Sequence, residues 1–175
     1  MRIVSNTTQN LRVNVITGVT TTDTPLAYAA GDPRFGVTPN IVAAAYSNNF
    51  SGATSTVLRD LDSNGDSLAT QAPPNEGTLN TQFPLGVFFG ELAGYDISGL
   101  TGTPYASLNL KDSFGFYTIS SSGAALMGNF NFEVLDTAAP VGAQVFPAAV
   151  SEPGSLSLLV LSALGLFAAR RRRQA

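Results

Sequence analysis

Leu58-Arg59-Asp60-Leu61-Asp62-Ser63-Asn64-Gly65-Asp66-Ser67-Leu68-Ala69-Thr70 is the stretch that decides the fold class. Two short segments with apolar residues flank Ser63-Asn64-Gly65, a cluster of residues that favour turns. This pattern is typical of a β-hairpin, in which two antiparallel strands are joined by a tight turn. In one interpretation, Asn64 and Gly65 supply the positive φ angles of a type I′ turn. The stretch therefore predicts strands on both sides of Gly65.

Two further segments, Leu11 to Thr21 and Phe116 to Met127, repeat this order of strand, glycine turn and strand. Residues 11–15 and 129–135 alternate between apolar and polar side chains, as half-buried strands do. Ile41 to Tyr46 is apolar but short, which favours a buried strand over a helix. No long amphipathic helix is evident before the C-terminal tail. The sequence predicts an all-β protein.

The turn glycines of the three hairpins are Gly18, Gly65 and Gly123, which stand 47 and 58 residues apart. Propeller blades of four strands repeat at about 40 to 50 residues, so the hairpins fit successive blades. A β-sandwich also contains glycine hairpins, and the spacing alone leaves it open.

Residues 2–128 contain many short runs that stand in a fixed order. They include Thr24-Pro25-Leu26-Ala27-Tyr28-Ala29-Ala30-Gly31-Asp32-Pro33, Pro39-Asn40-Ile41-Val42-Ala43-Ala44-Ala45-Tyr46, Gly94-Tyr95-Asp96-Ile97 and Phe116-Tyr117-Thr118-Ile119. Together these runs resemble the bacterial domain of unknown function 4394. The resemblance implies a β-propeller-like fold, and it carries no established activity. Because Met1 falls inside the family's domain, we expect the chain to hold its C-terminal part only, an incomplete set of blades. Truncation would also explain why residues 1–6 lack the apolar core of a signal peptide.

The tail, residues 151–175, has three parts: Ser151-Glu152-Pro153, the uncharged run of fifteen residues from Ser155 to Ala169, and Arg170-Arg171-Arg172-Arg173. At 1.5 Å per helical residue, the run is about 22 Å long, which is short for a membrane span of about 30 Å. The four arginines favour a cytoplasmic C-terminus.

This order of parts resembles the PEP-CTERM sorting signal, although Ser151 replaces the usual first proline. The resemblance implies that an exosortase in the inner membrane recognises and cleaves the tail during export to the cell envelope or extracellular matrix. A plain tail anchor is the alternative. It differs in predicting that the mature protein keeps its arginines.

Asp60, Asp62, Asn64 and Asp66 have the D-x-D-x-N-G spacing of calcium-binding loops, in which alternate side-chain oxygens surround the cation. The twelfth position of a full EF-hand loop would be Glu, but here it is Gln71. These four residues are therefore the candidate metal ligands, of a shorter calcium loop. The competing interpretation is the plain hairpin turn described above.

The chain has no histidine and no cysteine, which excludes Ser-His-Asp triads, Cys-His pairs and ordinary zinc sites. Residues 1–150 carry five Arg/Lys and eleven Asp/Glu, a net charge of −6, which argues against binding nucleic acid. Paired carboxylates remain possible, as in a carbohydrate-active enzyme, but most acids stand next to turn residues.

These features together predict a β-propeller-like domain over 1–135, a flexible linker over 136–150 and a sorting signal over 151–175 with a transmembrane helix at 155–169. We expect no catalytic residues and no cofactor beyond calcium. The expected function is structural or adhesive, at the cell envelope or in the extracellular matrix, after transient anchoring in the inner membrane. The expected partners are exosortase, the inner membrane and exopolysaccharide.

Overall fold

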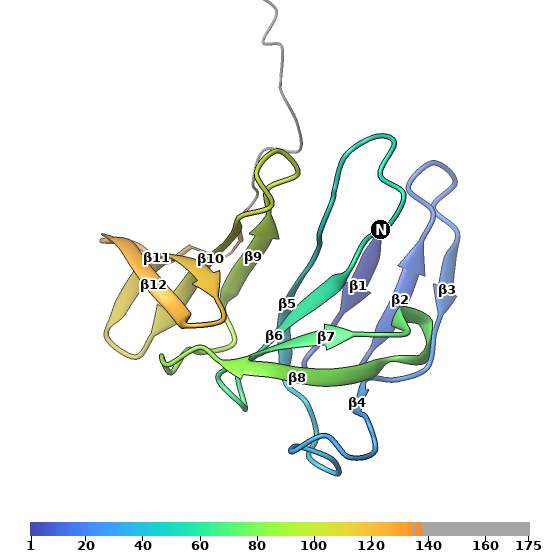
Figure 1. Cartoon of the computed structure of the whole chain (residues 1–175), viewed down its shortest axis with the longest axis horizontal. Coiled ribbons are helices and arrows are strands. Elements are labelled where there is room, and N and C mark those ends of the chain that lie inside the picture. The colour runs from blue at the N-terminus through green and yellow to red at the C-terminus, as the bar shows by residue number, and fades with distance from the viewer. Residues whose placement is uncertain (135, 138–175) are drawn as a thin grey trace, which may run out of the picture. The chain divides into compact units, whose positions relative to one another are not determined.

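A computed structural model describes residues 1–134 and 136–137. This part of the chain contains twelve β-strands, one short 3-10 helix and no α-helix, which confirms the all-β class. The strands form three separate sheets, and none of the sheets is closed (Figure 1). No helix within these residues is long and apolar enough to cross a membrane.

The first sheet has the order β1-β2-β3 and the second has the order β4-β8-β7-β6-β5. The strands of the first are β1 (Arg2–Val4), β2 (Asn10–Val13) and β3 (Thr20–Thr22). Those of the second are β4 (Ala27–Tyr28), β5 (Ile41–Tyr46), β6 (Leu58–Asp62), β7 (Ser67–Gln71) and β8 (Thr78–Pro84), with the 3-10 helix η1 (Pro74–Glu76) before β8. All pairs are antiparallel except β4 with β8, which is parallel.

The third sheet has the order β12-β11-β10-β9 and is antiparallel throughout. Its strands are β9 (Ala93–Ile97), β10 (Pro104–Leu110), β11 (Ser113–Ser120) and β12 (Gly123–Phe130). It is a meander, because each strand pairs with the next one along the chain.

All three predicted hairpins are present, as β2–β3, β6–β7 and β11–β12. Ile41 to Tyr46 is the strand β5, as predicted. The prediction of a strand over 129–135 is wrong at its C-terminal side, because β12 ends at Phe130. Phe114 is the β11 partner of Phe130, and β11 begins only one residue earlier, so residues 131–134 have no strand to pair with.

Side chains alternate along the strands of the second sheet, so apolar residues point to both of its faces. Each face is covered by a separate core. One face packs against the third sheet, in a core that includes Leu61, Leu68, Tyr95 and Leu108. The other face shares a smaller core with the chain before β5, including Leu26, Tyr28, Ile41 and Leu79, with Val4 of β1 packed against it. Because Leu61 belongs to the first of these cores, its neighbours Asp60 and Asp62 in β6 are directed to the opposite face.

Asp136 and Thr137 were predicted to begin the flexible linker. The structure places Thr137 against the third sheet, where its hydroxyl lies 2.7 Å from that of Ser107. Just before it, the carbonyl of Val134 accepts a hydrogen bond of 3.4 Å from the Asn109 side chain. Ordered contacts therefore continue to Thr137; the rest of the predicted linker lies outside the described residues.

Candidate functional site

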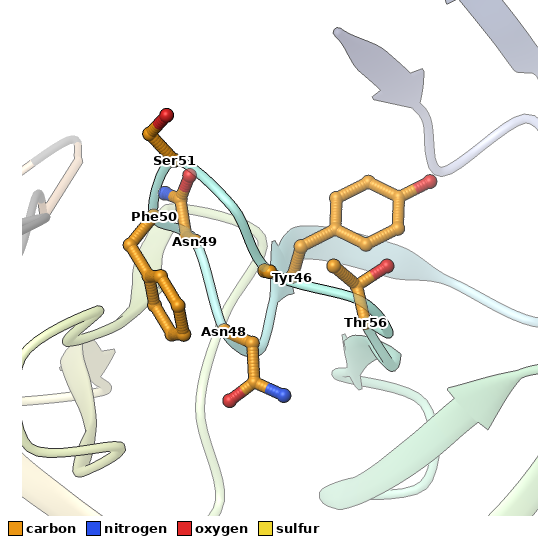
Figure 2. Close-up of a pocket in the computed structure, with 7 residues that line it drawn as sticks. Tyr46, Asn48, Asn49, Phe50, Ser51 and Thr56 are labelled. Atoms are coloured by element: carbon orange, nitrogen blue, oxygen red, sulfur yellow. The ribbon is translucent and has the colours of Figure 1, made fainter.

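The loop between β5 and β6, residues 47–57, forms a pocket of about 670 Å³ with the end of β5 (Figure 2). The two ends of the loop are joined by hydrogen bonds between Ser47 and Val57. The Ser47 amide donates to the Val57 carbonyl, and the Val57 amide donates to Ser47 Oγ, both at 2.9 Å. Asn48 has a φ of +51°, a left-handed conformation that asparagine tolerates well. Its side chain donates to the Ser55 carbonyl at 3.0 Å, so the loop is held from inside.

Aromatic, amide and hydroxyl groups line this pocket, and none of its residues is charged. The lining residues are Tyr46, Asn48, Asn49, Phe50, Ser51, Ala53 and Thr56. Figure 2 shows Thr56 beside Tyr46, whose ring extends away from Phe50. The Phe50 side chain is 47% exposed and offers an apolar surface to solvent.

Such a set of groups suits a neutral, polyhydroxylated ligand. Amides both donate and accept hydrogen bonds, hydroxyls do the same, and an aromatic ring covers the apolar face of a sugar. The lining contains no titratable side chain other than the phenol of Tyr46.

Tyr46 also lines a second pocket, of about 600 Å³, on the side of the first sheet. This pocket is lined by Met1, Arg2, Arg12, Val13, Asn14, Thr17, Val19, Thr21 and Tyr46. It differs from the loop pocket in containing two arginines. Tyr46 thus separates a neutral pocket from a basic one.

The two arginines of the basic pocket share one carboxylate, that of Asp23. Arg12 binds it through two nitrogens, Nε at 2.8 Å and Nη2 at 3.0 Å, and Arg2 Nη1 lies 2.6 Å from Asp23 Oδ2. The hydrogen bonds from Arg12, and then the one from Arg2, lower the pKa of Asp23, so this carboxylate stays ionised to a lower pH than a free aspartate does. The same pairing raises the pKa of Arg12. The cluster of two cations and one anion has a net charge of +1.

The carboxylate of Asp62, predicted as a metal ligand, is occupied by internal hydrogen bonds. Its Oδ1 accepts from the amides of Asn40 at 3.0 Å and Asn64 at 2.9 Å. Its Oδ2 accepts from the Tyr28 hydroxyl and lies 3.3 Å from Arg34 Nη2. Asp62 thus joins β4, β6 and the chain before β5.

The other predicted ligands are placed separately. Asp66 Oδ1 accepts from the Phe89 amide at 3.1 Å, and the Asn64 side chain donates to the Thr38 carbonyl at 3.3 Å. Asp60 is 0% exposed on the inner face of β6. Across residues 1–134 and 136–137, no three acidic side chains are grouped to hold a metal ion. The calcium site stays a prediction, without a cluster of acids to support it.

The turn of this hairpin differs from the predicted type I′ turn. Its left-handed residue is Asp66, with a φ of +45°, and neither Asn64 nor Gly65 has a positive φ. A Cβ at Gly65 would stand 2.7 Å from the guanidinium carbon of Arg34, so the Arg34 side chain would have to shift. The sequence predicted the hairpin, but not this long-range contact.

Asp60 is the most unusual titratable group that the structure describes. Neither of its carboxyl oxygens has a hydrogen-bond partner among the described residues. Burial raises its pKa to about 8, and the positive charge of Arg2 offsets this shift only in part. The carboxyl is therefore largely protonated at neutral pH, so a cation would have to displace its proton in order to bind it.

The tail residues with a predicted role in sorting lie outside the described residues. They are Ser151, Glu152, Pro153, Arg170, Arg171, Arg172 and Arg173, together with the predicted helix 155–169. The loop pocket was not predicted. Its one sequence signal is Asn48-Asn49-Phe50-Ser51-Gly52, a run of turn-forming residues interrupted by an aromatic.

Comparison with known proteins gave one match, to a protein family. Residues 1–138 match the family described as Domain of unknown function (DUF4394). No curated protein and no solved structure matches the chain. The match covers most of the 175 residues and all of the strands described above. The chain therefore belongs to the DUF4394 family.

Proposed function

We propose that this protein is a non-enzymatic, exported component of the cell envelope or extracellular matrix, and that it binds exopolysaccharide at the loop pocket beside Tyr46. The observation that carries the proposal is the lining of that pocket. It combines two rings, two amides and three hydroxyls with no charge, and it is open to a ligand. Ligand sites of this kind orient a substrate by a few polar groups on an otherwise apolar surface.

Delivery to the envelope is the second part of the proposal, and it is supported by the order of the tail. An exosortase would recognise Ser151-Glu152-Pro153, the apolar run 155–169 would hold the chain transiently in the inner membrane, and the arginines would stop transfer. The acidic, histidine- and cysteine-free domain suits a structural or adhesive cargo. The linker after Thr137 would let the peptide reach the processing enzyme.

The propeller-like architecture is the third part. Two observations support it: the three sheets follow one another along the chain, and the second packs against its neighbours on both faces. Packed sheets in series are the building plan of propeller blades. We propose that the second and third sheets are blades of such a ring.

A carbohydrate-active enzyme is the second candidate, and one observation favours it. A third pocket, of about 570 Å³, contains two carboxylates, Glu91 and Glu133, beside the exposed ring of Phe88. Two carboxylates across a cleft are the requirement for glycoside hydrolysis. Release of new reducing ends from a polysaccharide, lost in Glu91→Gln and in Glu133→Gln, would establish this function instead.

Tyr46→Ala tests the binding proposal. The substitution removes the ring that borders the loop pocket, and we expect it to weaken polysaccharide binding about tenfold, since one aromatic contact contributes roughly 1 kcal/mol or more. Affinity electrophoresis in gels containing neutral polysaccharides measures the effect. Tyr105→Ala is the matched control, because Tyr105 is also half-buried but stacks on Phe116 of the third sheet. Equal binding by wild type and Tyr46→Ala would contradict the proposal.

A further inference from the structure

We propose that the basic pocket beside Tyr46 binds the carboxylate of an acidic polysaccharide through the guanidinium of Arg12. The inference rests on the proposed function, and it adds the class of polymer: a chain that contains uronic acids.

Asp23 orients Arg12 and leaves one edge of its guanidinium available. The carboxylate occupies Nε and Nη2, at 2.8 and 3.0 Å. A guanidinium has five N–H groups, so the edge formed by Nη1 and the second N–H of Nη2 can still bind a carboxylate through two parallel hydrogen bonds. Among the described residues no hydrogen bond uses Nη1 of Arg12. The side chain is 48% exposed, so a ligand can reach it.

Asp23 does not neutralise the positive charge around Arg12, because its single carboxylate pairs with both Arg12 and Arg2. Arg2 is 5% exposed, and it also donates to Asn10 Oδ1 at 2.7 Å and to Asn75 Oδ1 at 2.8 Å. These hydrogen bonds fix the Arg2 side chain, which lines the pocket with little exposed surface, while Arg12 is half exposed there. The net charge of +1 attracts an anion, although the domain as a whole is acidic.

The other arginine and lysine side chains outside this cluster are placed differently. Arg34 lies 3.3 Å from Asp62, and Arg59 lies beside Tyr95. Lys111 lines the pocket that also contains Glu91 and Glu133. Within residues 1–134 and 136–137, Arg12 is the side-chain cation that is half exposed beside neutral hydrogen-bonding groups, namely Asn14, Thr17 and Thr21. The N-terminal ammonium of Met1 lines the same pocket and donates to the Val13 carbonyl at 2.8 Å.

Tyr46 connects this anion site to the neutral loop pocket, because it lines both. A polymer that crosses Tyr46 would place neutral hydroxyls against Asn49 and Thr56, and a carboxylate against Arg12. A single uronate would contact only one of the two pockets. The arrangement thus suits a polysaccharide better than a small anion.

The experiment compares polygalacturonate with its methyl ester, which has the same sugar without the charge. The 175-residue chain, purified in a mild detergent, is titrated with each polymer by calorimetry, at low and at physiological salt. We expect wild type to bind polygalacturonate about tenfold more tightly, and added salt to reduce the difference. Arg12→Gln should remove the preference. Lys111→Gln, which makes the same change in net charge elsewhere, should keep it.

Each outcome separates the two proposals. Equal binding of both polymers, weakened by Tyr46→Ala, would overturn the uronate site and leave the proposed function standing. Binding of neither polymer would overturn both. A preference for polygalacturonate that persists in Arg12→Gln would show that another cation is responsible. Should Arg12→Gln fail to fold, as judged by circular dichroism, Arg12→Lys decides: loss of the two parallel hydrogen bonds should reduce the preference, and an undiminished preference overturns the inference.

Discussion

Gly77→Ala is expected to lower the free energy of unfolding by about 3 kcal/mol or more, the sum of backbone strain and a steric clash. Gly77 ends the 3-10 helix before β8 with a φ of +65°. A Cβ at this position would stand 2.4 Å from the Pro25 carbonyl oxygen and 2.5 Å from that of Thr24. Those carbonyls belong to backbone, and the next residues form β4, whose Ala27 amide donates to the Gly77 carbonyl at 3.0 Å. The clash can be relieved only by moving β4 away from β8.

Gly86→Ala is the matched control for this substitution. Gly86 has a similar φ of +75°, but a Cβ there would meet nothing within 4 Å. It should therefore cost only the backbone strain, about 1 kcal/mol. Urea denaturation, followed by circular dichroism, compares the two variants. Similar losses of stability in both would show that Gly77 does not hold β4 against the second sheet as described.

Asp60→Asn is expected to abolish a loss of stability that wild type shows as pH rises. Burial raises the pKa of Asp60 to about 8 in the folded protein, from 3.8. The folded state therefore binds a proton that the unfolded state has lost, and stability falls as pH rises between these two values. Each unit of difference is worth about 1.4 kcal/mol, so the loss across this range is on the order of a few kcal/mol. Asparagine resembles the protonated acid and does not titrate.

Thermal denaturation between pH 5 and pH 9 tests this expectation. The melting temperature of wild type should fall across the range, and Asp60→Asn should be the more stable protein at pH 9, by roughly 5 to 10 °C. Asp112→Asn is the control, because Asp112 is an exposed acid in the turn between β10 and β11. A melting temperature of wild type that is flat or rises from pH 5 to 9 would contradict a protonated, buried Asp60.

The lowered pKa of Asp23 acts in the opposite direction and at lower pH. Its ionised form is held by two arginines in the folded protein, so its contribution is present above the usual aspartate pKa and is lost as pH falls below it. The pKa of Asp32 is also lowered, so its ionised form stabilises the folded protein in the same way. Burial alone would raise this pKa, but the amides of Arg34 and Thr81 donate to the carboxylate at 2.8 and 2.6 Å and outweigh that effect. Stability should therefore be greatest near pH 4 to 5, between the two effects.

The hairpins could be predicted because local signals agreed: an apolar segment, a turn cluster and a second segment stood next to one another. The strand over 129–135 was predicted wrongly beyond Phe130, because alternation says nothing about a partner, and β11 extends only one residue past the partner of Phe130. Asp60 and Asp62 illustrate the same limit. In sequence they alternate with leucine, as a solvent-facing or metal-binding pair would, but the first sheet and Tyr28 cover that face.

The candidate site depends still more on long-range contacts. The basic pocket joins residues of β1 and β2, the β2–β3 loop and the end of β5, and Tyr46 is 34 residues from Arg12 in the chain. No local pattern connects these segments. The loop pocket itself comes from one continuous stretch, and its turn-rich composition was the signal that could have marked it.

We propose that residues 151–175 are a processing signal and that the β domain is its exported cargo. Intact-mass spectrometry of the mature protein, produced in a bacterium that contains an exosortase, tests this claim most directly. The predicted result is a mature form that has lost Arg170 to Arg173, together with retention of the tail when Glu152 and Pro153 are both replaced by alanine. A mature protein that keeps its four arginines in the wild-type chain would contradict the claim.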